Sequence, residues 1–465
     1  MLNTRGVHGW LSRNVFIPWV ILGPWTSGRR QYRAALVEAS IGVQTWQHSN
    51  PESRRYWVLN ELRAIVRWAG TRVPYYRELF HRIGFDPRTD FSFSDYRRLP
   101  ALDRDTVQSR AGDLIADGFS LNSLIANATG GSTGVPVHFW QDERSRAWRE
   151  AISRWAFGHT GFRPGDRIGL VWGSNVDPNI GETLRAQLID FLAHQQRNDC
   201  YRLSNEILDQ IDVRLSQYQP DFLRCYTSAS TLLARRLLAR QKQPTYPKRG
   251  IITGGEKLDT TQRAIIEDVF KVPTYETYGS RDCGFIAVQL SSTEQRLYVA
   301  GANVVVEPFD EPDQHSGNEI AVTLLHNQAM PFLRYRIGDR ARFPSDALDN
   351  PAEVLDEVTG RTLDHVCLPD GRLIHSIEFP QLFKDFDVLE YRVIQETSGD
   401  VQVQLVRGPT LTADQLARLE RILADNLRGV SVALSLLPAL ERTAAGKLRP
   451  VISRYQPSSS FAEAP

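Results

Sequence analysis

The chain lacks long apolar runs, paired cysteines and an excess of charge of either sign. No apolar run approaches the ~20 residues needed to span a bilayer. The four cysteines are far apart and form no CxxC pair, which disfavours a disulfide framework or a structural zinc site and favours a reducing cytoplasm. The formal net charge is only +1, so a broad nucleic-acid-binding surface is not indicated.

The most apolar stretch runs from Val15 to Trp25 and is broken by proline and glycine. Two arginines precede it, as in a signal peptide, but no small-x-small cleavage site follows. We therefore expect a packed or membrane-surface element rather than a cleaved signal, which leaves peripheral membrane association open.

What is present fits a soluble globular protein with more than one domain. Hydrophobic residues make up 42% and charged residues 23% of the sequence. A length of 465 residues exceeds one ordinary core and suits a large domain plus a smaller one.

The first half of the chain changes from a helical pattern to a strand-and-helix alternation. Apolar residues recur at three- and four-residue spacing over residues 31–83, which predicts helices, and residues 102–125 look like helices around a loop. Short apolar runs then predict strands at 168–173, 222–226, 250–254 and 272–278. Helical segments at 204–217 and 228–241 separate them, which indicates an α/β sheet. Such sheets bind ligands at the carboxyl ends of their strands.

The second half predicts antiparallel strands and then a compact segment. The strands are expected at 297–299, 303–307, 319–324 and 333–335. After Gly360, a strand at 401–406, a helix at 412–427 and a strand at 430–436 form a small α+β unit. The predicted fold class is thus α/β, with a large N-terminal domain of mixed sheets and helices (1–359) and a small mobile α+β C-terminal domain (360–455). A disordered tail (456–465) is expected to follow.

The strongest local signal is a loop of glycines and hydroxyl residues near position 130. Its members are Thr129, Gly130, Gly131, Ser132, Thr133 and Gly134. Three glycines let successive backbone N–H groups converge on an anion, and the hydroxyls add donors. The loop is not a GxxxxGK[ST] P-loop, and a flexible turn is the plain alternative. Alone, it leaves phosphate binding and a simple turn both open.

Five later segments strengthen the phosphate interpretation. They are Gly254-Gly255-Glu256, Tyr278-Gly279-Ser280-Arg281-Asp282, Tyr335-Arg336-Ile337-Gly338-Asp339, Gly360-Arg361-Thr362-Leu363-Asp364 and Glu441 to Arg449. In this order and spacing they resemble the signature motifs of the adenylate-forming superfamily, which includes acyl-CoA synthetases, adenylation domains and luciferases. The TGGSTGxP form of the loop resembles most the phenylacetate–CoA ligase family, and within it the CapK-type branch of capsular-polysaccharide clusters.

The resemblance implies a nucleotide site. The Thr129–Gly134 loop is expected to hold the β- and γ-phosphates of ATP. The resemblance implies backbone contacts to adenine from Gly254, Gly255 and Glu256, and stacking of Tyr278 on the adenine ring. Gly279 is expected to let the backbone approach the nucleotide or acyl group, with Ser280 beside it in the nucleotide site. Asp339 is expected to accept both ribose hydroxyls, with Arg361 close to the nucleotide. Asp282 stands where the family usually has Glu and is expected to hold Mg²⁺.

The C-terminal motif is expected to carry the catalytic lysine. The chain has only six lysines among 55 Lys plus Arg residues, so arginine supplies most of its positive charge. Lys447, in a Gly-flanked loop, is therefore less expected as a generic surface charge. A compact ammonium can bridge a carboxylate and the α-phosphate during adenylation. The plain alternative is a solvated loop. The resemblance also implies that Asp364 is a hinge between the domains.

The predicted activity is therefore ATP-dependent conversion of a carboxylic acid to acyl-AMP, followed by acyl transfer, most directly to coenzyme A. The acid pocket is expected at strand ends, lined by Trp172, Gly173, Tyr226, Thr227 and Thr277, whose aromatic residues suit an aryl or medium acyl group. Transfer to an amine or a sugar in surface-polysaccharide synthesis is an alternative. A non-catalytic nucleotide-binding scaffold in polysaccharide assembly is an alternative of another class.

Overall fold

A computed structural model describes most of the chain. The described residues are 27–128, 137–172, 184–200, 205–310, 317–348, 350–361, 365–369, 373–375, 379–383, 385–442 and 448–455. Within these ranges no helix is long and apolar enough to cross a membrane. The apolar stretch from Val15 to Trp25 lies outside the described residues.

The N-terminal helices confirm the helical pattern read from the sequence. They are α3 (Ser27–His48), α4 (Pro51–Arg72), α5 (Pro74–Ile83), α6 (Phe93–Tyr96) and α7 (Arg104–Ser109), followed by the 3₁₀ turn η2 (Leu121–Ser123). Proline begins both α4 and α5, where its missing N–H costs no helical bond. The hairpin β1 (Ile125–Ala128) and β2 (His138–Gln141) comes next, and α8 (Glu143–His159) then packs along α3.

The central sheet has eight strands in the order β13-β9-β8-β7-β6-β5-β3-β4. The bounds are β3 (Ile168–Val171), β4 (Gln195–Asn198), β5 (Phe222–Tyr226), β6 (Gly250–Gly254), β7 (Thr274–Ser280), β8 (Gly284–Val288), β9 (Leu297–Val299) and β13 (Val354–Leu355). Strands β4, β3, β5, β6 and β7 pair in parallel, whereas β8, β9 and β13 join antiparallel. The predicted α/β sheet is confirmed, and its parallel part holds the four strands expected from the apolar runs.

Helices cover the parallel part of this sheet. They are α9 (Leu184–Leu192), α10 (Asn205–Tyr218), α11 (Thr227–Ala239) and α12 (Thr260–Phe270). Apolar residues of α10, α11 and α12 form one core with the inward side chains of β5 and β6. Since α11 begins at the residue after β5, this packing also fixes the carboxyl end of that strand.

A second, four-stranded antiparallel sheet has the order β10-β11-β12-β14. Its strands are β10 (Val304–Pro308), β11 (Asn318–Leu324), β12 (Tyr335–Arg342) and β14 (Glu357–Arg361), with the turn η3 (Ser345–Leu348) between the last two. The expected strand at 333–335 is wrong, because the strand starts only at Tyr335. Arg334 has φ of 50°, a left-handed conformation that interrupts a strand, and its guanidinium pairs with Glu307 in the core.

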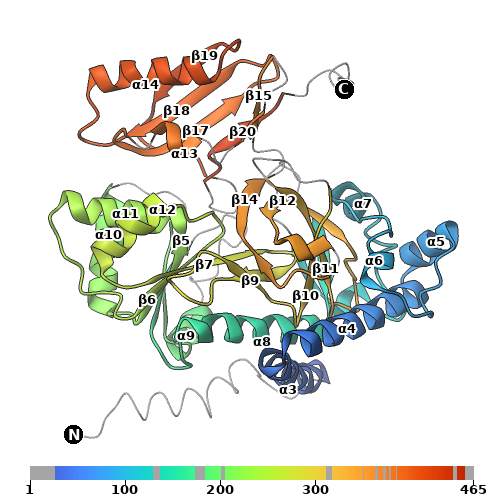
Figure 1. Ribbon diagram of the computed structural model, residues 1–465. Helices are drawn as coiled ribbons and strands as arrows, with labels where there is room; N and C mark the ends of the chain where they lie inside the picture. The colour runs from blue at the N-terminus through green and yellow to red at the C-terminus, as the bar shows by residue number, and fades with distance from the viewer. Residues whose placement is uncertain are drawn as a thin grey trace, which may run out of the picture.

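The C-terminal part forms its own layer. Strands β17 (Val388–Gln395), β18 (Val401–Arg407), β19 (Val432–Leu436) and β20 (Val451–Ser453) form a sheet of order β19-β18-β17-β20, with α13 (Phe379–Phe383) and α14 (Ala413–Asn426). The hairpin β15 (His365–Cys367) and β16 (Leu373–His375) precedes it. Its apolar residues form a separate core. Figure 1 shows this sheet and α14 on the side of the molecule opposite α3, α4 and α8.

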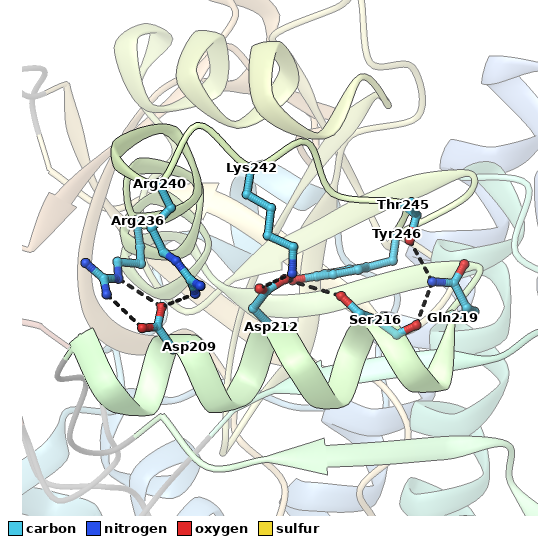
Figure 2. Close-up of polar contacts among 9 residues, drawn as sticks. All are labelled: Asp209, Asp212, Ser216, Gln219, Arg236, Arg240, Lys242, Thr245 and Tyr246. Atoms are coloured by element: carbon cyan, nitrogen blue, oxygen red, sulfur yellow. Dashed lines mark hydrogen bonds and ion pairs between the residues drawn. The ribbon is translucent and has the colours of Figure 1, made fainter.

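Ion pairs hold α10 against α11 and the segment after it (Figure 2). Asp212 of α10 is 1% exposed, binds the ammonium of Lys242 and accepts a hydrogen bond from the Tyr246 hydroxyl at 3.0 Å. One turn earlier, Asp209 binds two arginines of α11, Arg236 and Arg240, closer to solvent. The buried half of this network fixes the helix whose first turn lies at the end of β5.

We expect Asp212→Ala to destabilise the protein by about 3 kcal/mol, because it leaves a buried tyrosine hydroxyl and an ammonium without their acceptor. Asp209→Ala is the matched control and should cost only about 1 kcal/mol, since its partners reach solvent. Urea unfolding followed by tryptophan fluorescence measures both. Equal losses for the two variants would contradict the assignment of the stabilisation to the buried pair.

Candidate functional site

The residues predicted to line an acid pocket meet at the carboxyl edge of the parallel strands. Tyr226, Gly254 and Thr277 occupy one row across β5, β6 and β7. Trp172 follows β3 directly, and its ring stacks on that of Tyr226 with centroids 4.0 Å apart. A Cβ at Gly254 would lie 2.6 Å from the Thr277 hydroxyl, so this row has no room for a side chain there.

A second group joins the two sheets. The Tyr278 hydroxyl, on β7, donates a 2.8 Å hydrogen bond to the Asp339 carboxylate on β12. Asp339 in turn is the backbone partner of Arg361 in the pairing of β12 with β14. Three of the sequence motifs, separated by up to 83 residues, therefore converge at one point.

The hairpin that follows Gly279 explains why this position needs a glycine. A Cβ at this position would lie 2.2 Å from the carbonyl oxygen of Gly284, a distance that no side chain tolerates. The sequence motif implied a close approach of Gly279 to a nucleotide or acyl group. The close approach in the structure is instead to the backbone of β8, which turns the chain back and fixes the position of Tyr278.

Asp282 lies in the same turn and is only 4% exposed. One carboxylate oxygen accepts the Ser280 hydroxyl and the Cys283 N–H, the latter at 3.1 Å. Burial and the nearby Asp282 charge raise the pKa of Tyr335, which faces the carboxylate. No cluster of three acidic, His or Cys side chains able to hold a metal exists among the described residues. This environment does not fit direct Mg²⁺ binding unless Asp282 gives up these bonds, so its metal role stays a prediction.

Glu256 connects the two domains. One carboxylate oxygen accepts the N–H of Ser228, in the first turn of α11, at 2.7 Å, and the other accepts the N–H of Leu448 at 2.8 Å. The Thr227 hydroxyl also donates to the Glu256 carbonyl at 3.1 Å. The sequence motif implied backbone contacts of Glu256 with adenine; the structure gives its side chain an additional role between the domains.

Arg442 adds a second contact between the domains. Its guanidinium donates to the Ser228 hydroxyl at 3.0 Å and forms an ion pair with Glu390 of β17, with 4% and 6% of the two side chains exposed. Burial raises the pKa of the Glu390 carboxyl, and the Arg442 charge opposes this shift. Nearby, Arg235 of α11 donates to the Val388 carbonyl at 2.7 Å. The start of α11 is thus the docking point of the C-terminal sheet.

Some predicted positions cannot be placed. Thr129, Gly130, Gly131, Ser132, Thr133, Gly134, Gly173, Asp364 and Lys447 lie outside the described residues. Arg361 is described through its backbone only. Gly255 follows β6 with φ of 79°, a left-handed conformation that favours glycine.

Comparison with known proteins was made by sequence and by structure. No family model matches the chain. Phenylacetate-coenzyme A ligase of Thermus thermophilus is 20% identical over 84% of this chain and 94% of the relative. The protein CapK of Staphylococcus aureus is 23% identical over 67% of this chain and 70% of the relative. A 2-hydroxyisobutyryl-CoA ligase in its postadenylation state superposes with a TM-score of 0.67 at 17% identity, covering 87% of this chain and 90% of the ligase.

This chain has the fold of the adenylate-forming ligases. The resemblance predicted from the six motifs is confirmed by these relatives and by the shared fold. The same 2-hydroxyisobutyryl-CoA ligase in its thioesterification state gives a lower TM-score, 0.55.

Two residues of the ligase-like site, Arg442 and Glu390, were not predicted from the sequence. Arg442 lies inside the C-terminal motif, whose predicted functional residue was Lys447. Glu390 lies in β17, an alternating strand that was not predicted. A charged residue in the motif and an acidic residue in an alternating strand were the available signals, but their pairing depends on how the C-terminal domain folds.

We expect Glu256→Ala to speed amide hydrogen exchange at both Ser228 and Leu448 by about tenfold or more, because a hydrogen bond to a charged acceptor is lost at each site. Peptide-level exchange mass spectrometry measures both segments in one experiment. Glu294→Ala, at a partly exposed position before β9, is the control and should change neither. Faster exchange at Ser228 alone would mean that the carboxylate caps α11 without holding the C-terminal domain.

Proposed function

We propose that this chain is an AMP-forming ligase that activates a carboxylic acid with ATP and transfers the acyl group to coenzyme A. The observation that carries the proposal is the hydrogen bond from Leu448 to Glu256. Leu448 follows Lys447 in the sequence, and Glu256 follows β6 in the motif expected to contact adenine. This bond supports a site at the strand ends that uses both domains.

In the first half-reaction, a carboxylate oxygen of the acid attacks the α-phosphorus of ATP. The bond from this phosphorus to the bridging oxygen breaks, so that acyl-AMP and pyrophosphate form. Lys447 is proposed to neutralise the charge that builds up between the carboxylate and the α-phosphate. ATP enters as its Mg²⁺ complex, and no step is routed through Asp282. In the second half-reaction, the thiol sulfur of coenzyme A attacks the acyl carbonyl, AMP leaves, and the thiol proton passes to solvent.

The nucleotide is proposed to lie against Tyr278 and Asp339. A carboxylate offers about four acceptor sites, enough for both ribose hydroxyls as well as the Tyr278 phenol. The hydrogen bond between the two side chains orients the ring and the carboxylate before the nucleotide arrives, which favours binding. The aromatic pair Trp172 and Tyr226, one row away, supports an adjacent place for the acyl group.

We assign this conformation to the adenylation side of the cycle, because the N–H of Leu448, the residue after Lys447, bonds to Glu256 at the carboxyl edge of the parallel strands. Transfer to coenzyme A then needs the C-terminal domain to rotate, with Asp364 as the proposed hinge. Such a rotation would break the contacts of Leu448 with Glu256 and of Arg442 with Ser228. Both are hydrogen bonds between polar groups of the two domains, which suits contacts that form and break in each cycle.

The activation step is tested by a pyrophosphate-release assay with a panel of acids. The acyl acceptor is tested by product analysis after addition of coenzyme A, amines or sugars. Thioester formation supports the proposal. An amide or ester product would favour the polysaccharide-related alternative instead. Absence of pyrophosphate release with every acid, from protein that binds ATP, would favour the scaffold alternative.

We expect Asp339→Ala to raise the dissociation constant of ATP about 30-fold, which corresponds to ~2 kcal/mol, because two ribose hydroxyls lose their acceptor. Tyr278→Phe is the matched control: it keeps the ring and removes only the hydroxyl, so the constant should change less than about threefold. Isothermal titration calorimetry measures both, and circular dichroism checks folding. Normal ATP binding by Asp339→Ala would place the ribose elsewhere.

We expect Lys447→Ala to slow acyl-AMP formation about 10²-fold or more, because charge stabilisation in the transition state is lost. Transfer from pre-formed acyl-AMP to coenzyme A should continue. The two half-reactions are measured separately, with Lys271→Ala as control, since Lys271 is an exposed lysine that pairs with the exposed Asp268 of α12. Equal loss in both half-reactions would contradict a role confined to adenylation.

A further inference from the structure

An arginine stands in the middle of an otherwise apolar strand beside the proposed acyl site. Arg224 is the third residue of β5, between Phe222 and Tyr226 on the same face of the sheet. Its guanidinium lies 5.2 Å from the ring centroids of Phe157 and Trp172 and 5.8 Å from that of Phe285. The side chain is thus surrounded by aromatic rings, yet it remains partly exposed to solvent.

Among the described residues, no acidic side chain neutralises this cation: Arg224 forms no ion pair, and its side chain forms no hydrogen bond. Burial lowers the pKa of its guanidinium below the usual value, and the charged group that adds to this effect is another cation, Arg197. Arg197 lies in the same row of the sheet, with Leu170 between the two arginines, and is paired with Asp190 at 2.8 Å. The local charge at Arg224 is therefore positive and uncompensated.

Other arginines in the interior of this protein have polar partners. Arg149 donates to the carbonyls of Arg281 and Asp282, and Arg334 and Arg442 each pair with a buried glutamate. Aromatic rings attract a guanidinium through their faces, but they do not accept its five N–H groups. No nitrogen of Arg224 is among the buried side-chain atoms that lack a partner, so its N–H groups reach solvent and are open to an incoming anion.

The position of Arg224 relates it to the acyl site. Tyr226, two residues further along β5, stacks on Trp172 and shares its row with Gly254 and Thr277. Two residues of strand span roughly 6.6 Å. Suppose that the reacting carboxylate of an acid lies at the level of that row. A second group on the same acid would then lie at the level of Arg224 if about one benzene ring, or about four to five carbons, separated it from the carboxylate.

We propose that Arg224 binds an anionic group at the far end of the acid, so that the substrate is a dicarboxylic acid of aromatic or medium-chain type. This inference rests on the proposed function and adds the substrate class. The aromatic rings contact the body of the acid, and the guanidinium binds the second carboxylate through two parallel N–H···O bonds. The second carboxylate supplies the acceptor that none of the described residues provides at this place.

The test compares matched acids that differ only in the second carboxylate: hexanoate with adipate, and phenylacetate with 4-carboxyphenylacetate. In pyrophosphate release, we expect the wild type to favour each diacid by at least tenfold in kcat/KM. Arg224→Met should lower this ratio at least 30-fold, mainly through the KM of the diacid, and Arg224→Lys should keep part of it. Arg236→Met, at the remote α10–α11 network, should leave the ratio within threefold.

Calorimetric binding of adipate and hexanoate separates this inference from the proposed function. Diacid binding that needs Arg224, without pyrophosphate release, would support the anion site and refute the ligase activity. A wild type that uses or binds both members of each pair equally would overturn the inference. That comparison needs no variant, so it decides the matter even where Arg224→Met fails to fold. An unchanged diacid preference in folded Arg224→Met would overturn it as well.

Discussion

The Glu256 carboxylate accepts two backbone N–H groups, one at the start of α11 and one at Leu448 in the C-terminal domain. The first of these would otherwise lack a side-chain acceptor, because Tyr226, at the N-cap of α11, provides none. A negative charge at this helix end is also favoured by the helix dipole. One side chain therefore stabilises the helix that follows β5 and the loop that carries the C-terminal motif. The proposed site depends on this double contact, since it uses groups from both domains.

The strand order explains why motifs far apart in sequence converge here. Parallel pairing of β3, β5, β6 and β7 brings their carboxyl ends to one edge, where β6 and β7 carry two of the motifs and β3 and β5 carry predicted pocket residues. The antiparallel turn into β8 then reverses the chain at Gly279, and the Tyr278 hydroxyl reaches across to Asp339 on the second sheet. The two sheets thus meet at a polar contact, in contrast to the apolar packing beneath them. A nucleotide bound there would touch both sheets and the C-terminal domain.

Sequence patterns predicted the parts of this arrangement that depend on local chemistry. The runs at 222–226 and 250–254 are strands with the predicted bounds, because buried parallel strands are continuously apolar. The strand expected at 333–335 was displaced by a left-handed Arg334, whose conformation depends on a distant glutamate. The bonds of Glu256 with Leu448 and of Arg442 with Ser228 were beyond prediction, since they exist only after two domains dock. A pattern shows which face a side chain occupies, but it does not show its partner.

The preference of this chain for arginine makes its exceptions informative. Only six of 55 basic residues are lysines, and several buried arginines use the fork of the guanidinium to bind two acceptors each. Lys447 differs from these residues because it is a lysine. Its compact ammonium suits transient contact with one oxygen of the acid's carboxylate and one of the α-phosphate. Arg224 differs from the buried arginines in environment, since it has the fork without the acceptors. Both departures fall in segments expected to meet at the carboxyl edge of the sheet, one proposed for the reacting end of the acid and the other for its far end. An acid with a charge at each end would satisfy both.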